Sequence, residues 1–120
     1  MAKKTNKGVV GTSFYETTIL SSIQELTDIL GSPQYNNRNS DNVDKVMVEW
    51  VCETEDGDVF TIYDWKEYKV SKDSDIIRFH IGGHSKQITE NALKEITRSK
   101  RNRNIKLITL QMLKNKWKKT

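Results

Sequence analysis

The sequence has one cysteine, one proline and two histidines, and it lacks any long run of apolar residues. The lone Cys52 excludes an internal disulfide and a paired-cysteine metal site, and its place in an apolar strand pattern predicts a buried, inert thiol. His80 and His84 are separated by two glycines and cannot share a helix face, so we expect neither a metal site nor a catalytic triad. The sequence therefore indicates a binding protein without a cofactor, and not an enzyme.

Membrane-targeting signals are also missing from the sequence. No segment approaches the ~20 apolar residues that cross a bilayer. Residues 1–7 are basic and lead into a strand-like segment, where a signal peptide would continue with an apolar run. We therefore expect a cytoplasmic protein that has no membrane partner.

Charge is distributed unevenly along the 120 residues. Residues 94–120 carry ten Lys or Arg and one acid, a net charge of +9, whereas residues 1–93 carry a net charge of −5. We predict an α+β core domain, residues 1–98, and a basic C-terminal helical extension, residues 99–120. The extension either attracts phosphates or acidic surfaces, or uses its charge only to keep an amphipathic helix soluble. The candidate nucleic-acid-binding residues are Lys100, Arg101, Arg103, Lys114 and Lys116.

Hydrophobic periodicity predicts the first elements. A short strand is expected over residues 8–14, followed by a helix over residues 17–30 that carries one apolar stripe. Gly31 and Pro33 end this helix, because a glycine suits the residue after a helix and a proline cannot continue it. The polar residues 34–44 are typical of an exposed loop.

A β-hairpin gives the clearest local signal. Residues 45–54 and 58–65 have strand composition, and the Asp56-Gly57 dipeptide between them favours a two-residue type I′ turn. A turn of that length fixes which residues lie opposite each other. The expected pairs are Val48 with Trp65, Glu49 with Asp64, Trp50 with Tyr63 and Val51 with Ile62.

The remaining sequence predicts one strand and two helices. A strand is expected over residues 76–81, a helix over residues 85–98 and, after a basic joint at residues 99–104, a third helix over residues 105–118. The wide apolar surface of the third helix favours packing on the core or on another subunit, and we expect a homo-oligomer. The predicted fold is α+β, with a small antiparallel sheet in the order β-α-β-β-β-α, helices on one face and a basic C-terminal helix.

Two glycines at the end of the last strand suggest an anion site. A free backbone at Gly82 and Gly83, followed by the start of a helix, can direct amide groups and the Lys86 ammonium toward one phosphate. The alternative is a plain glycine turn with Ser85 as the helix cap. The candidate residues of this site are Gly82, Gly83, His84, Ser85 and Lys86.

Two further groups could contact a nucleobase. Glu49 and Asp64, predicted to lie opposite each other, can share a proton, hold a metal or accept hydrogen bonds from the amino group of a base. Two exposed carboxylates at a sheet edge are the favoured interpretation. Trp65 and Tyr68 follow the second hairpin strand and are the candidate stacking residues, although aromatic side chains more commonly pack in a core.

Three segments resemble a known group of proteins. Glu49-Trp50, residues 61–66 (TIYDWK) and residues 80–83 (HIGG) are similar to motifs of a family of small phage and giant-virus proteins of unassigned role, and Gly31-Ser32-Pro33 fits a further element of that pattern. Phe79 stands where the family usually has Trp. The resemblance covers about residues 8–97. It implies a viral protein that acts in the cytoplasm of an infected host cell, in a role similar to that of anti-defence factors.

These observations lead to one expected function and two alternatives. We expect a viral protein that sequesters a phosphorylated nucleotide signal, or another anionic small molecule, through the candidate residues above. The first alternative is a nucleic-acid-binding module that acts through the basic C-terminal helix. The second is an inhibitor that docks this helix on an acidic host protein.

Overall fold

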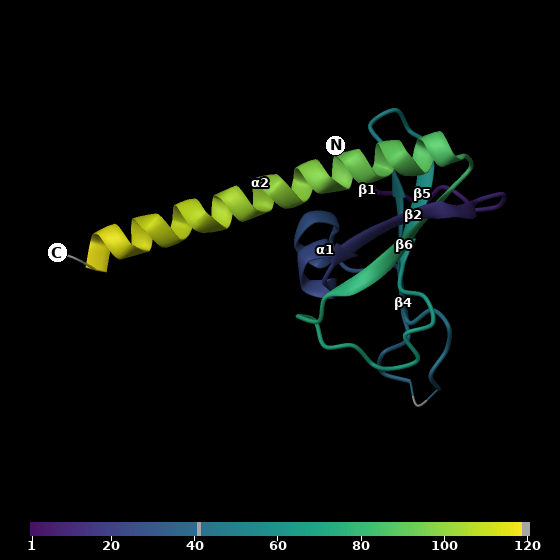
Figure 1. Cartoon of the computed structure of the whole chain (residues 1–120), viewed down its shortest axis with the longest axis horizontal. Coiled ribbons are helices and arrows are strands. Elements are labelled where there is room, and N and C mark those ends of the chain that lie inside the picture. The colour runs from purple at the N-terminus through teal and green to yellow at the C-terminus, as the bar shows by residue number, and fades with distance from the viewer. Residues whose placement is uncertain (41, 119–120) are drawn as a thin grey trace.

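The chain forms an antiparallel sheet that two helices cover on one side (Figure 1). The computed structural model describes residues 1–40 and 42–118, so part of the loop expected at residues 34–44 and the last two residues of the predicted basic extension lie outside the described chain. The predicted α+β class is confirmed. The elements are β1 Lys3–Lys4, β2 Ser13–Ser21, α1 Ile23–Leu30, β3 Tyr35–Asn36, β4 Val48–Glu53, β5 Val59–Tyr63, β6 Ile77–Gly83 and α2 Lys86–Lys118.

The strands are ordered β1-β4-β5-β6-β2, and β3 pairs with β4 beside β1. All pairs are antiparallel. β2 therefore closes one edge of the sheet by pairing with β6, although the two strands are far apart in the sequence. Residues 17–21, which were expected to begin the first helix, belong to this strand instead.

The predicted first helix is wrong in its first third. Residues 17–21 extend β2, and α1 begins only after Ser22, whose hydroxyl accepts a hydrogen bond from the Glu25 amide at 3.1 Å. The β-branched Thr17, Thr18 and Ile19 favour a strand. The Ser22-x-x-Glu25 spacing is typical of a helix start at this point, but the prediction followed the longer apolar stripe instead.

The hairpin register differs by one residue from the prediction. Trp50 lies opposite Ile62 and Glu49 lies opposite Tyr63, because the turn has three loop residues instead of two. The Thr54 amide bonds the Asp58 carbonyl at 2.9 Å, and Gly57 has a φ of 87°. A three-residue loop with glycine in the left-handed region is the next commonest hairpin connection. The shift of one residue exchanges the β5 side chains that share a face with Trp50, so that Ile62 replaces Tyr63 there.

The core lies between the sheet and the helices. Trp50, Phe60 and Phe79 are fully buried, and Ala92 and Ile96 of α2 pack against them. The Trp50 indole N–H donates to the Gly31 carbonyl at 2.8 Å, so the end of α1 is tied to the centre of the sheet. Cys52 is also buried, which confirms the prediction of a buried thiol, and burial raises the pKa of this thiol to about 12.

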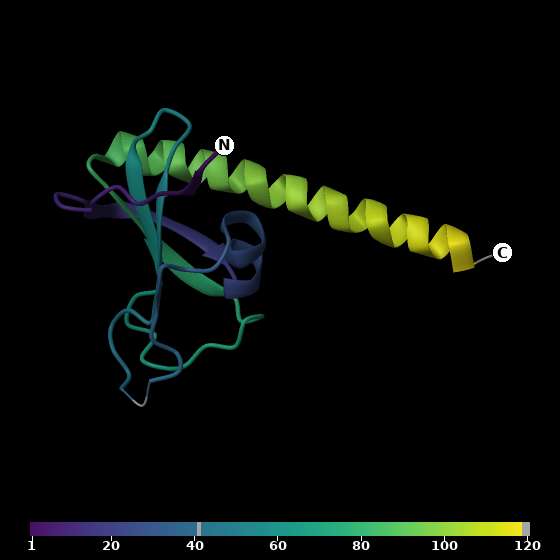
Figure 2. The ribbon, with the colours of Figure 1, turned by 180° about the vertical axis from the view of Figure 1, so that it is seen from behind.

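α2 is one continuous helix of 33 residues, where two helices and a basic joint were predicted. The last glycine of the chain is Gly83 and its one proline is Pro33, so no helix-breaking residue falls within α2. The first half of α2 crosses the sheet and the second half leaves the body (Figures 1 and 2). We call residues 104–118 the overhang, and every one of them is exposed.

Candidate functional site

The sheet face that points away from α1 and α2 carries a group of ring side chains. Along β5 and β6, Ile62 and Ile81 point into the core, so their neighbours Tyr63 and His80, which lie opposite each other, point outward. We call this side the outer face. The two helices that the structure describes both lie on the other side of the sheet.

Four rings from three segments form a contiguous cluster on the outer face. We call it the aromatic row, and it consists of Phe14, Tyr63, Trp65 and His80. The His80 imidazole stacks on Phe14 with ring centroids 4.0 Å apart and an interplanar angle of 11°. The ring centroids of Trp65 and His80 are 6.0 Å apart with an interplanar angle of 28°, and Tyr63 meets both rings at steeper angles. Trp65 is 39% exposed, so solvent reaches this end of the row.

A bulge in β2 brings Phe14 to the row. The register with β6 shifts between Phe14, which lies opposite Gly82, and Thr18, which lies opposite His80. Glu16 sits inside the shift with a φ of 67°. A bulge re-aims side chains and is common beside functional sites, and here it places the Phe14 ring against His80.

Gly82 provides the space beneath the row. A Cβ atom at this position would lie 2.8 Å from the Thr61 hydroxyl oxygen and 3.6 Å from the Tyr63 ring. A side chain therefore cannot fit there unless Thr61 or Tyr63 moves. The absence of a side chain at Gly82 is what lets the Tyr63 ring lie close to the sheet.

Burial changes the titration of groups in and beside the row. The pKa of His80 is lowered by desolvation, against the opposing effect of the Glu16 charge. The Nδ1 atom of His80 is buried and has no hydrogen-bond partner within the described part of the chain. Burial raises the pKa of Glu49, and burial together with the Glu49 charge raises the pKa of Tyr63. The outer face thus places an imidazole with a lowered pKa and a carboxyl group with a raised pKa beside the stacked rings.

Two cations flank the aromatic row. The Lys66 ammonium lies 5.6 Å from the centroid of the Trp65 ring. Arg78 precedes His80 by two residues, lies on the same face of β6 and donates to the Thr18 hydroxyl at 3.2 Å. Positive charge therefore lies beside the Trp65 part of the row, where it can attract an anionic group.

The prediction of a free glycine turn is wrong, because Gly82 and Gly83 belong to β6 and are buried. They pair with Phe14 and Ser13 of β2 on one side and with β5 on the other. A Cβ atom at Gly83 would lie 3.0 Å from Thr89 of α2, so this glycine allows the strand and the helix to approach closely. The backbone is committed to the sheet and does not form an anion cradle.

The other residues of the predicted anion site have structural partners. The Ser85 hydroxyl accepts from the Ile88 amide at 3.2 Å and acts as the helix cap, which is the plainer of the two readings of this turn. The Lys86 ammonium donates to the Tyr15 carbonyl at 3.1 Å. His84 is exposed, and its carbonyl accepts from the Tyr15 hydroxyl at 3.3 Å. These groups do not converge on one point.

The predicted Glu49–Asp64 pair is also corrected by the hairpin register. Asp64 is buried, and one of its carboxylate oxygens accepts from the amides of Met47 and Val48 at 2.8 and 3.0 Å. It therefore fixes the start of β4. Glu49 remains on the outer face, half-buried and opposite Tyr63.

The remaining predicted residues are divided between engaged and exposed positions. Tyr68 is 54% exposed in the loop after β5. Lys100 and Arg103 contact α1: Lys100 lies 3.3 Å from Glu25, and Arg103 lies 2.7 Å from Asp28. The three other predicted nucleic-acid-binding residues are exposed on α2, and they are Arg101, Lys114 and Lys116.

The sequence did not predict that Phe14 belongs to the site, nor that the His80 imidazole stacks with its aromatic rings. The signal for His80 was available, since Glu49, Tyr63, Trp65 and His80 all come from the three motif segments that carry the family resemblance. The structure brings these segments together on one face. Phe14 lacked such a signal, because its position depends on the bulge in β2.

Comparison of the chain with protein-family models, with curated proteins and with solved structures finds no match. Within the described chain, no helix is long and apolar enough to span a membrane.

Proposed function

We propose that the chain binds single-stranded nucleic acid, with a base stacked on the aromatic row of the outer face. The observation that carries this proposal is the cluster of Phe14, Tyr63, Trp65 and His80 on the side of the sheet opposite the helices. A sheet with ring side chains on its open face and helices behind it is a recurring platform for unpaired bases. Trp65, the most exposed of the four rings, is the stacking surface.

The groups beside the row match the other parts of a nucleotide. Lys66 and Arg78 supply positive charge for the flanking phosphates, and the Glu49 carboxylate can accept a hydrogen bond from a base amino group. His80 Nδ1 is a buried polar atom next to the rings, without a hydrogen-bond partner among the described residues. The site contributes binding without a catalytic step, and the ligand should be recovered unchanged after incubation.

A free phosphorylated nucleotide is the second candidate ligand. The row can stack one base as readily as a base within a strand, and a free nucleotide would favour the sequestering, anti-defence role that the family resemblance implies. Enclosed pockets are the usual sites for such small ligands, whereas the row lies on an open sheet face, so the strand is preferred. The experiment below separates the two ligands.

Tryptophan fluorescence tests the proposal directly. Trp50 is buried, so a Trp117→Phe background leaves Trp65 as the accessible reporter. Titration should include short single strands of DNA and RNA, a duplex of the same sequence, cyclic dinucleotides and ADP-ribose isomers. We expect quenching by single strands and weaker binding to the duplex. Trp65→Ala, followed by anisotropy of a labelled strand, should weaken binding by about 5- to 150-fold, the effect of losing one stacked base.

Two control variants make the titration decisive. Tyr68→Ala removes an exposed ring outside the row and should leave the affinity within about twofold. Replacing Lys114 and Lys116 by Gln measures how much of the affinity comes from the basic helix, which is the alternative nucleic-acid site. Binding that survives Trp65→Ala but is lost in the lysine variant would move the site to α2. Absence of binding to every ligand by folded protein would refute the proposal.

A further inference from the structure

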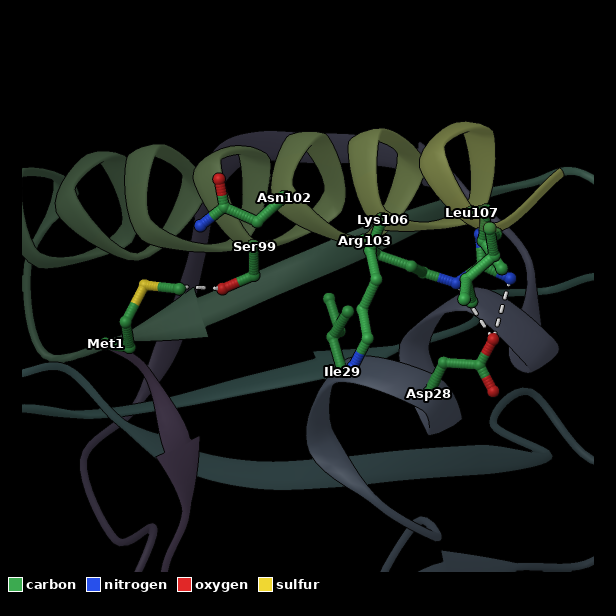
Figure 3. A pocket seen from close by; sticks show the side chains of 9 residues that line it. Met1, Asp28, Ile29, Ser99, Asn102, Arg103, Lys106 and Leu107 are labelled. Atoms are coloured by element: carbon green, nitrogen blue, oxygen red, sulfur yellow. Dashed lines mark hydrogen bonds and ion pairs between the residues drawn. The ribbon is translucent and has the colours of Figure 1, made fainter. Parts of the chain in front are cut away.

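Two hollows of the described surface differ in whether their charged groups already have partners. Figure 3 shows a cleft between α1 and the second half of α2, where Arg103 reaches toward Asp28. Charged atoms of these two side chains lie 2.7 Å apart, and Arg103 also lies 3.5 Å from Glu25, so its guanidinium is already engaged within the chain. A second hollow lies on the outer face beside Glu49, whose carboxyl group is not engaged in this way.

Strand pairing places a line of side chains across the outer face, perpendicular to the strands. His80 lies opposite Tyr63, which in turn lies opposite Glu49. Glu49 then lies opposite Tyr35 of β3. Directly opposed residues of an antiparallel pair have their side chains on the same face, so Tyr35 extends the outer face beyond the aromatic row. Glu49 therefore stands between two tyrosines.

The hollow lies at the Tyr35 end of this line and has a volume of about 230 Å³. It is lined by Tyr35, Asp44, Lys45, Val46 and Glu49. Tyr35 is 41% exposed, which leaves its ring accessible to a ligand in the hollow. Sites for drug-sized ligands have volumes of about 300–1,000 Å³, so this hollow suits a smaller group, such as a single base.

The Glu49 carboxyl group is the polar group that the chain leaves available in the hollow. It is half-buried, and no hydrogen bond or ion pair joins it to another described residue. The Asp44 carboxylate, by contrast, accepts from the Lys45 amide at 2.7 Å. Burial of a carboxylate without partners is costly, and a ligand edge with N–H donors would satisfy its oxygens. Two carboxylates against one ammonium also make the hollow less favourable for a phosphate than for a neutral group.

The edges of the bases differ in how well they match a carboxylate. An ionised carboxylate only accepts hydrogen bonds, and its two oxygens can accept two parallel N–H bonds. The Watson–Crick edge of guanine has two adjacent donors, N1–H and the N2 amino group. Adenine and cytosine place one donor next to a ring nitrogen that accepts, and uracil and thymine place one donor between two carbonyl oxygens. With each of these other bases, one carboxylate oxygen would face another acceptor.

We propose that this hollow binds one guanine base of a single strand, with N1–H and the N2 amino group donating to the two carboxylate oxygens of Glu49. The Tyr35 ring packs against this base, and another base of the same strand stacks on Trp65. The inference rests on the binding of single strands proposed above. It adds a base preference that stacking alone does not give, because every base has a face that can stack.

The test is the affinity of the full chain for short oligothymidine strands that carry one central guanine, adenine, cytosine or inosine. Anisotropy is measured at about pH 8, which favours ionised Glu49. We expect the guanine strand to bind about 5- to 150-fold more tightly than the adenine and cytosine strands, the discrimination given by one bidentate pair. Inosine lacks the N2 amino group and should bind about fivefold more weakly than guanine. The analogue 7-deazaguanine keeps both donors and should bind within about twofold of guanine.

Two variants distinguish Glu49 from the other acid of the hollow. Glu49→Gln replaces one acceptor by a donor, so its amide matches the donor and acceptor on the edge of adenine or cytosine. The guanine preference should be lost, and the guanine strand should bind at least about tenfold more weakly. Asp44→Asn is the matched control in the same hollow, and it should leave the preference within about twofold. Circular dichroism verifies that both variants are folded.

The outcomes separate this inference from the proposed function. Equal affinity for every central base, with binding lost in Trp65→Ala, would overturn the guanine site and leave the stacking site in place. A guanine preference that survives Glu49→Gln, or that is lost in Asp44→Asn, would also overturn the inference. Absence of binding to every strand by folded protein would overturn both.

Discussion

The two halves of α2 differ in what surrounds them. In the first half, Thr89, Ala92, Glu95 and Ile96 are buried against the sheet and the hairpin. In the overhang, every residue from 104 to 118 is exposed, although about half of these residues are apolar. The two halves of one continuous helix therefore lie in different environments, the first against the core and the second in solvent.

The difference assigns the two halves separate roles. Burial of the first half is part of the folding of the domain, because the helix and the sheet share one core. Isolated helices of about 12–15 residues are marginal in water, so the overhang depends on its connection to the body. The body therefore holds the buried core and the aromatic row, while the overhang leaves its side chains exposed.

The largest expected difference in the free energy of unfolding is between substitutions of two tryptophans, one in each region. Trp50 is fully buried and donates to the Gly31 carbonyl, whereas Trp117 is 76% exposed. Trp50→Ala should lower the free energy of unfolding by about 3–5 kcal/mol, because it leaves a large cavity. Trp117→Ala should lower it by less than about 0.5 kcal/mol. Urea unfolding of dilute protein measures both values.

The glycines provide a second contrast. Gly82→Ala should cost about 1–3 kcal/mol, since the added Cβ would meet the Thr61 hydroxyl at 2.8 Å. Gly8→Ala is the control, because a Cβ there meets no atom within 4 Å. Gly82→Ala should also disturb the Tyr63 ring and weaken ligand binding at the row. Equal stability of the two variants in thermal unfolding would show that the space beneath the row is looser than the structure indicates.

The sequence predicted the fold class and the strands β4, β5 and β6, but not β1, β3, most of β2 or the connections that depend on long-range contacts. The hairpin was recognised from Asp56-Gly57, yet those residues are compatible with a two- or a three-residue loop. The structure selects the longer loop, and with it Phe60 and Ile62 enter the core. Periodicity within one strand cannot decide this, because a shift of one residue exchanges the two faces.

The candidate site was predicted in part. Trp65 and Glu49 lie on the outer face, as a nucleobase site would need, whereas the glycines and Asp64 serve the fold. Local sequence suggested a free backbone at Gly82 and Gly83, because two glycines before a helix resemble a turn. Their actual role is close approach of strand, strand and helix, which becomes visible only when β2 and α2 are in place.

A smaller effect should appear in the pH dependence of the body. Desolvation lowers the pKa of His80 below its ordinary value of 6.5, so the unfolded chain binds a proton more readily than the folded one. The stability contributed by neutral His80 is present above about pH 6.5 and is lost as the pH falls toward the lowered pKa. Glu49, whose pKa is raised, acts in the opposite direction, because its protonation favours the fold.

The variant His80→Phe separates the two effects. It keeps a ring against Phe14 and removes the titrating group, so the difference in unfolding free energy between the natural sequence and the variant isolates His80. We expect this difference to shift against the natural sequence as the pH falls from 7.5 to 5.5, a range that brackets the ordinary value of 6.5. A difference that stays constant over this range would show that His80 is as accessible to protons as it is in the unfolded chain.

The smallest expected effect lies at the boundary between the two regions. Arg103 holds the pKa of the Asp28 carboxyl below its ordinary value of 3.8, chiefly by hydrogen bonding. Ionised Asp28 therefore stabilises the fold above its ordinary pKa of 3.8. This contribution to stability is lost as the pH falls through the lowered pKa of the folded state. Because Asp28 and Arg103 are partly exposed, Arg103→Gln should cost less than about 1 kcal/mol at pH 7 and nothing measurable near pH 2.

Hydrogen exchange distinguishes a boundary role for Arg103 from a purely local one. If Arg103 anchors the overhang to α1, Arg103→Gln should speed amide exchange throughout residues 104–118 and leave the amides around Ala92 and Ile96 protected. Arg101→Gln, on an exposed side of the same helical turn, is the matched control and should change neither region. An equal acceleration in both halves of α2 would mean that they unfold together, and the overhang would then be part of the body's cooperative unit.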